Sequence, residues 1–289
     1  MILLDKLYKK EGEENMDYTQ REISAVRFYQ GSGVFGESDP FYMMDSAYQT
    51  LNLLMMPGRE GERVRVGVER QNPKSLCITR WEKTLEVMTD LFTVLCKYAR
   101  EQREKGAALP NPLARGDRGV NFRLMEQGGG TIAFTSTSHG EALIDFVRGK
   151  QEPHLLHITL GEGVPYLDYD GFFGAANGFA EEREVLLPPM VSMCCSEIEE
   201  LYHPGLGMVR HCHLTLKGFA PDCTVEEEDK LIGILNTHAE TAAEGLNDLV
   251  KRRLEADILA QPEHPYWIWK AAFRQLVLQR MKHIHSSYC

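Results

Sequence analysis

The chain has 289 residues, 43% of them hydrophobic, and a formal net charge of −10 at pH 7. This size and apolar content exclude a disordered chain or a small scaffold that depends on disulfides, and they allow one large domain or a core domain with an extension. The negative charge argues against non-specific binding to nucleic acid, because binding to phosphates requires a basic surface.

Cysteine usage and the N-terminal sequence indicate where the chain folds. Seven cysteines are an odd number, and Cys194 and Cys195 are adjacent, which favours free thiols in a reducing compartment. The opening MILLDKLYKKEGEEN lacks the apolar run of a secretory signal. No stretch approaches the roughly 20 apolar residues that a membrane helix needs. We expect a cytoplasmic protein as synthesised, without a membrane partner; delivery into a host or competitor cell stays open.

The N-terminal part of the chain predicts helices. A charged leader over residues 1–14 precedes a helical lobe over residues 15–111. Thr19, followed three residues later by Glu22, forms a capping box that marks the start of a helix. The spacing of apolar residues predicts three further elements: helices at 40–56 and 81–104 and a short strand at 62–70.

From residue 112 the pattern changes to short strands, which predict a β core over residues 112–218. A short helix is expected at 140–148, and the glycine- and aromatic-rich segment 168–183 is expected to be a mobile surface loop. Many short strands with one interposed helix predict an α+β fold of two small packed β-sheets. The expected strands are 131–136, 154–160, 164–167, 184–187, 191–195 and 207–217.

Residues 219–289 predict a C-terminal helical extension. Thr224 is expected to cap a helix over residues 224–256, and Pro262 to begin a last helix rich in apolar residues. The end of the chain, with His283, His285 and Cys289, is expected to be a frayed tail.

Three short motifs follow one another on separate strand-like segments: Arg115-Gly116, then Ser136-Thr137-Ser138, then Glu182-x-Glu184. In this order they resemble the mono-ADP-ribosyltransferases of the bacterial toxin and vertebrate ecto-enzyme kind, which split NAD and transfer ADP-ribose to a protein. The phrases AVRFYQGSG and AYQTLNLL are also similar to the opening helices of that family. The resemblance covers about residues 15–218 and does not include the C-terminal helices.

The resemblance makes Glu184 the catalytic carboxylate, which binds the ribose 2′-hydroxyl of NAD. Positive charge builds on this ribose as neutral nicotinamide leaves. A carboxylate facing that charge therefore stabilises the transition state more than the ground state. NAD is then a consumed substrate, and no metal is expected. The alternative for Glu184 alone is a solvated charge at a strand edge.

Glu182 lies two residues earlier and points to the same side as Glu184 on an extended chain. In the family the first acid of this pair engages the acceptor, and the Glu-x-Glu motif is found in enzymes that modify arginine. The resemblance therefore implies an arginine acceptor on a protein that the sequence does not identify. A carboxylate can orient a planar guanidinium through two hydrogen bonds. The alternative is a wet end of a loop, because Glu181 is acidic as well.

Arg115 is expected at the end of the first core strand, where the family's arginine braces the phosphate and ribose of NAD. The following glycine, Gly116, lets the backbone approach the nicotinamide amide. The residue before the arginine is Ala114, where the family often has an aromatic residue. Arg118 is a competing candidate, and a simple turn made by ARGDRG is the plain alternative.

The resemblance places the serine triplet at the NAD pocket, with Ser136 hydrogen-bonded to the catalytic glutamate. Thr137 and Ser138 are expected to cap the following helix. Phe172 and Phe173 lie in the loop before the glutamates, where the family often has an aromatic residue for target recognition. Packing of these rings into the core is an equal alternative.

Other clusters carry weaker signals. His211 and His213 share one face of an alternating strand and could bind a metal, but the sequence shows no further ligand at a suitable spacing. No cysteine has the surroundings of a catalytic nucleophile. Two other functions remain open: an NAD glycohydrolase on the same fold, with water as acceptor, and a non-catalytic interaction protein that binds through its C-terminal helices.

Overall fold

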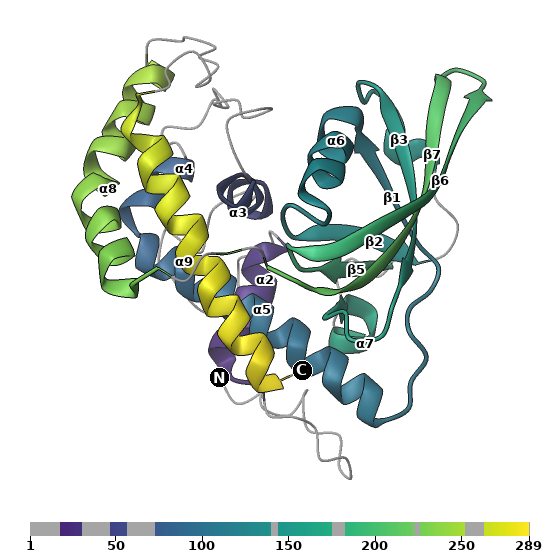
Figure 1. Ribbon diagram of the computed structural model, residues 1–289, viewed down its shortest axis with the longest axis horizontal. Coiled ribbons are helices and arrows are strands. Elements are labelled where there is room, and N and C mark those ends of the chain that lie inside the picture. Colours follow the sequence, from purple (N-terminus) through teal and green to yellow (C-terminus); the bar gives the residue numbers. More distant parts are fainter. Residues whose placement is uncertain are drawn as a thin grey trace.

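The computed structural model describes residues 18–30, 47–56, 73–139, 144–174, 183–221, 223, 226–251 and 263–288. The leader and the strand expected at 62–70 lie outside these residues. Within them, a mixed β-sheet faces a layer of helices, and Figure 1 shows α8 and α9 on the left, the sheet on the right and α2 and α3 between them. The expected α+β class, with helical regions at both ends of the chain, is confirmed.

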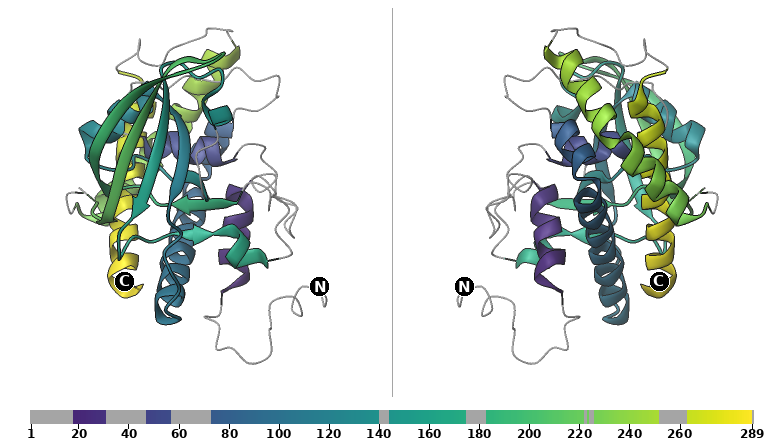
Figure 2. Two further views of the ribbon diagram at one scale, coloured as in Figure 1. Left: turned by 90° about the vertical axis from the view of Figure 1, so that its right-hand side faces the viewer. Right: turned by 90° about the vertical axis from the view of Figure 1, so that its left-hand side faces the viewer.

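The described strands form one continuous sheet of seven strands in the order β4-β5-β2-β1-β3-β7-β6. Among the described strands β3 and β7 form the one parallel pair, and the other neighbours are antiparallel. The two small sheets expected from the sequence are therefore parts of one sheet, which the β1–β2 pair joins. Figure 2 shows β2 and β5 running across the direction of β3, β6 and β7. The strands are β1 Leu113–Arg118, β2 Thr135–His139, β3 Pro153–Leu160, β4 Leu167–Asp168, β5 Glu184–Leu187, β6 Val191–His203 and β7 Gly207–Phe219.

Two long helices, α5 (Trp81–Glu104) and α9 (Pro265–Tyr288), pack against each other across the molecule. The helix α2 (Gln20–Tyr29) lies beside α5. The other helices are α3 Ala47–Met55, α4 Pro73–Thr79, α6 Gly119–Gly128, the 3₁₀ turn η1 Ile144–Val147, α7 Tyr169–Phe173 and α8 Glu228–Lys251. Among the helices of the described residues, none combines the length and apolar character needed to cross a membrane.

The capping box at the start of α2 is confirmed. The Thr19 hydroxyl accepts a hydrogen bond from the Glu22 amide at 3.2 Å, and the Glu22 carboxylate accepts one from the Thr19 amide at 2.7 Å. A cap of this kind contributes about 1 kcal/mol to helix stability. Glu22 also forms a buried ion pair with Lys97 of α5 at 2.7 Å, which fixes α2 against the longer helix.

The C-terminal helices pack directly on the N-terminal helical lobe. The Trp81 indole donates to the Asn236 side chain of α8 at 3.2 Å, and the Arg274 guanidinium of α9 donates to the Met55 carbonyl of α3 at 2.9 Å. Phe219, at the end of β7, lies 4.8 Å from the Phe92 ring of α5. The helices of the expected C-terminal extension therefore share one hydrophobic core with the lobe and the sheet.

Several elements differ from the sequence prediction. The helix over 81–104 and the strand over 184–187 have the predicted bounds, but α6 and α4 were not expected. The predicted helix at 140–148 is, in its described part, only the turn η1. The segment 168–183, expected to be a loop, begins with α7. The prediction that the end of the chain is a frayed tail is wrong. His283 and His285 belong to α9, and the centre of the His285 ring lies 5.1 Å from that of Phe219.

A truncation in α9 tests whether this helix belongs to the cooperative core. Phe273 is fully buried and stacks on Trp269 at 4.9 Å. Because Phe273→Ala leaves a cavity, we expect it to lower the free energy of unfolding by about 3–5 kcal/mol. Ile268→Ala, on the same helix but 51% exposed, is the control and should change it by less than about 0.5 kcal/mol. Equal small effects in denaturant titrations would show that α9 unfolds independently.

Candidate active site

Arg115 lies where strands β1 and β2 separate. These strands pair only at Leu113 with His139 and at Ala114 with Ser138. Beyond that point the Arg115 guanidinium bridges the strands, and its Nη1 donates a hydrogen bond of 2.6 Å to the Ser136 carbonyl oxygen. Arg115 therefore satisfies a backbone acceptor that the β1–β2 ladder no longer reaches. It lies within β1 and not at the strand end expected from the sequence.

Asp117 is a member of this cluster that the sequence analysis missed. Its carboxylate forms an ion pair of 2.9 Å with the Arg115 Nε and accepts hydrogen bonds from the Asn121 side chain and the Arg118 amide. Burial raises the pKa of the Asp117 carboxyl, but Arg115 and these donors outweigh it and hold the pKa below its usual value. The alternation along β1, which places Arg115 and Asp117 on one side, was the available signal.

Ser136 and Glu184 are in direct contact. The Ser136 hydroxyl donates a hydrogen bond to the Oε1 atom of Glu184. In the antiparallel β2–β5 pair Glu184 lies opposite Ser138, so Ser136, two residues away on the same face, is its diagonal neighbour. The expected contact between the first serine and the glutamate is thus present, and it links residues 48 positions apart in the chain.

Arg115, Ser136 and Glu184 consequently form one chain of contacts from β1 through β2 to β5. The competing candidate, Arg118, is the last residue of β1 and is exposed. The structure therefore brings Arg115, and not Arg118, to Ser136. The Arg115 side chain is 27% exposed, so solvent reaches part of this side chain.

Thr137, Ser138 and Gly116 have surroundings that differ from the expectation. Thr137 and Ser138 lie within β2, so their expected role as helix caps is wrong. Thr137 is 2% exposed and its hydroxyl donates to the Val185 carbonyl at 2.7 Å, which places it in the core, away from Ser136. A Cβ at Gly116 would lie 2.6 Å from the Phe146 backbone, so the glycine is required by the close approach of η1.

Tyr29 of α2 also borders the site, and the sequence analysis did not single it out. Its hydroxyl accepts a hydrogen bond from the Asn52 side chain at 3.0 Å and donates to the Phe134 carbonyl at 3.4 Å. Burial raises the pKa of the Tyr29 hydroxyl, and the charge of nearby Glu184 raises it further. The helical layer therefore contributes directly to the surroundings of Glu184.

Phe172 and Phe173 pack against the helical layer. Phe173 is 5% exposed, and the Arg27 guanidinium lies 3.5 Å from the centre of its ring. Phe172 meets the Tyr18 ring edge-on at 4.9 Å. These contacts fit the packing alternative and give target recognition by the two rings no support. Glu182, the expected acceptor-binding carboxylate, lies outside the described residues.

The histidine cluster is larger than the sequence indicated. His157 of β3 and His203 of β6 join His211, whose Nδ1 lies 3.0 Å from the His157 Nε2 and whose Nε2 lies 2.9 Å from the His203 Nε2. His213 stacks on His157 at 4.6 Å. Because His211 uses its two nitrogens toward different partners, one ion cannot reach all three rings. Among the described residues no group of three metal ligands converges.

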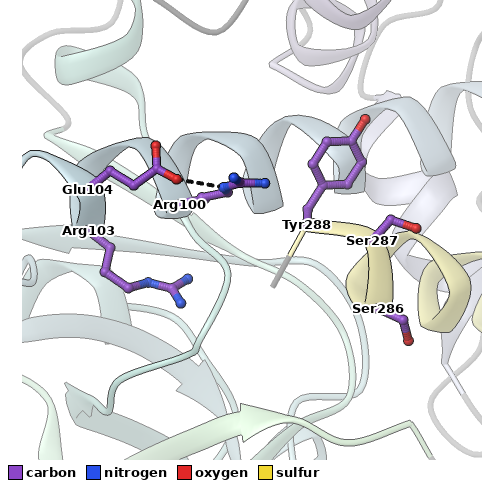
Figure 3. A pocket seen from close by; sticks show the side chains of 6 residues that line it. All are labelled: Arg100, Arg103, Glu104, Ser286, Ser287 and Tyr288. Carbon is purple, nitrogen blue, oxygen red and sulfur yellow. Dashed lines mark hydrogen bonds and ion pairs between the residues drawn. The ribbon is translucent and has the colours of Figure 1, made fainter.

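A separate hollow of about 300 Å³ lies between the C-terminal ends of α5 and α9 (Figure 3). One of its two arginines, Arg100, forms an ion pair with Glu104, with 2.7 Å between Nε and Oε1, which the dashed line marks. Its serines donate hydrogen bonds to carbonyls of their own helix. None of the motif residues is on these elements. The lining residues are Arg100, Arg103, Glu104, Ser286, Ser287 and Tyr288.

Comparison with known proteins gives structural neighbours only. Neither a family model nor a curated protein matches the sequence. Among solved structures the chain is similar to the ADP-ribosylating toxin BECa of a binary enterotoxin of C. perfringens, crystallised with NADH, at 16% identity and a TM-score of 0.43 over 69% of this chain and 44% of that one. It is also similar to Plx2a, an ADP-ribosyltransferase toxin from Paenibacillus larvae, at 12% identity and a TM-score of 0.39 over 68% and 86% of the two chains.

A third neighbour is the ADP-ribosyltransferase HopU1 of Pseudomonas syringae pv. Tomato DC3000, at 19% identity and a TM-score of 0.39 over 74% of this chain and 85% of that one. This chain spans less than half of BECa, 44% of its length. With identities this low, the function has to be inferred from the side chains of the site.

The histidine cluster predicts a stability that falls with acidification. Burial, with the neighbouring histidines, lowers the pKa of His157 and of His211 below the unfolded value of about 6.5, although Glu199 acts in the opposite direction. The unfolded chain therefore binds protons first as the pH falls through about 6.5, and the folded state loses stability in that range. Denaturant titrations between about pH 8 and pH 5 should show this loss. The double variant His157→Gln/His211→Gln should show a smaller one, and an equal slope would contradict the assignment.

Proposed function

We propose that this protein is an NAD-dependent mono-ADP-ribosyltransferase that modifies arginine on a target protein. The contact chain from Arg115 through Ser136 to Glu184 carries the proposal, because it joins the first residue of each of the first two motifs to the last acid of the third. Three residues far apart in sequence meet in the arrangement that the motif resemblance requires. A toxin or effector role rests on that resemblance alone.

Glu184 has the surroundings that the chemistry needs. It sits at the first residue of β5, is partly exposed, and has one carboxylate oxygen held by the Ser136 hydroxyl. A fixed carboxylate beside the ribose stabilises the positive charge that develops as nicotinamide leaves, without having to reorganise at that moment. Glu184 would hold the ribose 2′-hydroxyl of NAD, the consumed substrate, and no step of this reaction requires a metal.

Arg115 supplies the positive charge that an acidic protein must provide for a phosphate-containing substrate. Burial lowers the pKa of its guanidinium, but Asp117 outweighs this and keeps the group charged. Asp117 neutralises part of the charge of the Arg115 guanidinium. We therefore expect Arg115 to bind one phosphate or ribose oxygen of NAD and not to act as a strong anion site. Glu182 would orient the acceptor guanidinium through two hydrogen bonds.

The two glutamates can be separated by experiment. Glu184→Gln should abolish NAD consumption and protein labelling together, with a loss on the order of 10²–10³ in turnover. Glu182→Gln loses the charge that holds a guanidinium, so it should abolish labelling while NAD hydrolysis survives. The measurements are release of nicotinamide and transfer of label from NAD to proteins of a cell lysate, with modified peptides identified by mass spectrometry.

The neighbouring acid provides a matched control, because Glu181→Gln removes the same charge one position earlier and should leave both readouts unchanged. Free ADP-ribose without labelled protein in the wild type would identify an NAD glycohydrolase. If the wild type shows no NAD turnover, the result would favour the alternative of a non-catalytic interaction protein. Labelling that persists in Glu182→Gln would mean that the acceptor is not arginine.

Ser136→Ala tests the hydroxyl separately from the backbone. Arg115 holds the carbonyl of residue 136, which alanine retains, so the substitution removes only the hydrogen bond to Glu184. We expect turnover to fall with little change in the dissociation constant of NAD, measured by calorimetry. Ser196→Ala on β6, whose hydroxyl donates to the His213 carbonyl, is the control. Full turnover in Ser136→Ala would remove this serine from the site.

A further inference from the structure

Tyr169 lies beside Glu184 on the side away from β2. Strands β4 and β5 pair at Leu167 with Leu186 and at Asp168 with Val185. One step further in this antiparallel register, Tyr169 is the residue opposite Glu184. Tyr169 is also the first residue of α7. Glu184 is therefore flanked by the serine strand on one side and by Tyr169 on the other.

The Tyr169 hydroxyl is a buried polar group that forms no hydrogen bond among the described residues. The side chain is 0% exposed, and its oxygen is buried without a hydrogen-bond partner among the described residues. A buried hydroxyl without a partner destabilises the fold, and phenylalanine would fill the same space without that cost. An unpaired group kept at such a place indicates a partner that is engaged only in another state of the site.

The tyrosine is held rigidly. The Asp168 side chain caps α7 by accepting hydrogen bonds from the Asp170 amide at 3.0 Å and the Gly171 amide at 3.3 Å. The Tyr169 ring is nearly parallel to the Phe173 ring, with 6.1 Å between the ring centres, and the Arg27 guanidinium covers Phe173. The hydroxyl can therefore gain a hydrogen-bond partner through movement of Glu184 more easily than through movement of the tyrosine.

The phenol remains a hydrogen-bond donor throughout the physiological range. Burial raises the pKa of Tyr169 well above its usual value, the charge of Glu184 and the neighbouring Tyr29 raise it further, and Arg27 acts in the opposite direction. A neutral hydroxyl next to a carboxylate can only donate to it. The end of a glutamate side chain turns over a broad range of angles, so the Glu184 carboxylate can reorient without movement of β5.

We propose that Tyr169 is a positioning residue that donates a hydrogen bond to the Glu184 carboxylate when NAD occupies the site. Ser136 then holds one oxygen of Glu184 and Tyr169 restrains the carboxylate from the opposite side. This inference rests on the proposed function. It assigns to α7 the task of orienting the carboxylate and to the aromatic residues behind it the task of keeping α7 in place.

The test is Tyr169→Phe, compared with the wild type in three measurements. Without NAD, the melting temperature should be equal or higher, because no hydrogen bond is lost. With NAD, kcat for nicotinamide release should fall about 10- to 100-fold, the effect of losing a hydrogen bond to a charged group, while KM for NAD stays nearly constant. The acid limb of the kcat profile, which reports the NAD-bound enzyme, should move to higher pH, because a carboxylate that loses a donor has a higher pKa.

Tyr266→Phe is the matched control, since Tyr266 is a fully buried tyrosine of α9, and its turnover should equal that of the wild type. If Tyr169→Phe retains wild-type kcat and pH profile, the inference is overturned and the proposed function stands. A lower melting temperature with an unmoved pH profile would assign Tyr169 to packing and also overturn it. If the wild type itself does not consume NAD, the proposed function fails, and the inference fails with it.

Discussion

The partly buried guanidinium of Arg115, with its ion pair to Asp117, is the constraint on which the candidate site depends. A cation in this position must be neutralised and hydrogen-bonded, because an unpaired buried charge would destabilise the fold strongly. Asp117 supplies the charge, and Asn121 with the Arg118 amide satisfies the remaining lone pairs of Asp117. The same guanidinium holds the Ser136 carbonyl where β1 and β2 part. One ion pair is therefore connected by direct contacts to the point where the strands separate, to the backbone of Ser136 and, through the Ser136 hydroxyl, to Glu184.

The helical layer supports this arrangement from behind. Lys97 of α5 fixes α2 through its ion pair with Glu22, and α2 in turn brings Tyr29 and Arg27 toward the site. The C-terminal helices cover the far side of α5 and close the core with aromatic residues such as Trp269. Residues that carry no motif therefore pack against the elements that hold the site. This explains how the chain can tolerate an orphaned hydroxyl at Tyr169 beside the carboxylate, since the large core stabilises what the site destabilises.

The face of β3, β7 and β6 that carries the histidines has a different character. His157, His211 and His203 form a row of hydrogen-bonded imidazoles there, one from each strand. When all three rings are neutral, each has one N–H, which is enough to satisfy both links of the row. One additional proton can be held at an end nitrogen, but a second must break a link. The row therefore couples the pairing of these strands to protonation without any bound ion.

The sequence alone determined the features that depend on neighbouring residues. The capping box of α2, the extent of α5 and the short strand β5 follow from hydrogen bonds and apolar spacing within a few positions, and the α+β class follows from their order. The tertiary structure decided the rest: that Arg115 and not Arg118 reaches Ser136, that Asp117 belongs to the cluster, that Phe173 is buried, and that the end of the chain is a helix of the core. Each of these depends on partners far away in sequence, as Ser136 and Glu184 are, 48 positions apart. Local periodicity contains no information about such pairs, because the strand register that brings them together is set by the packing of the whole sheet.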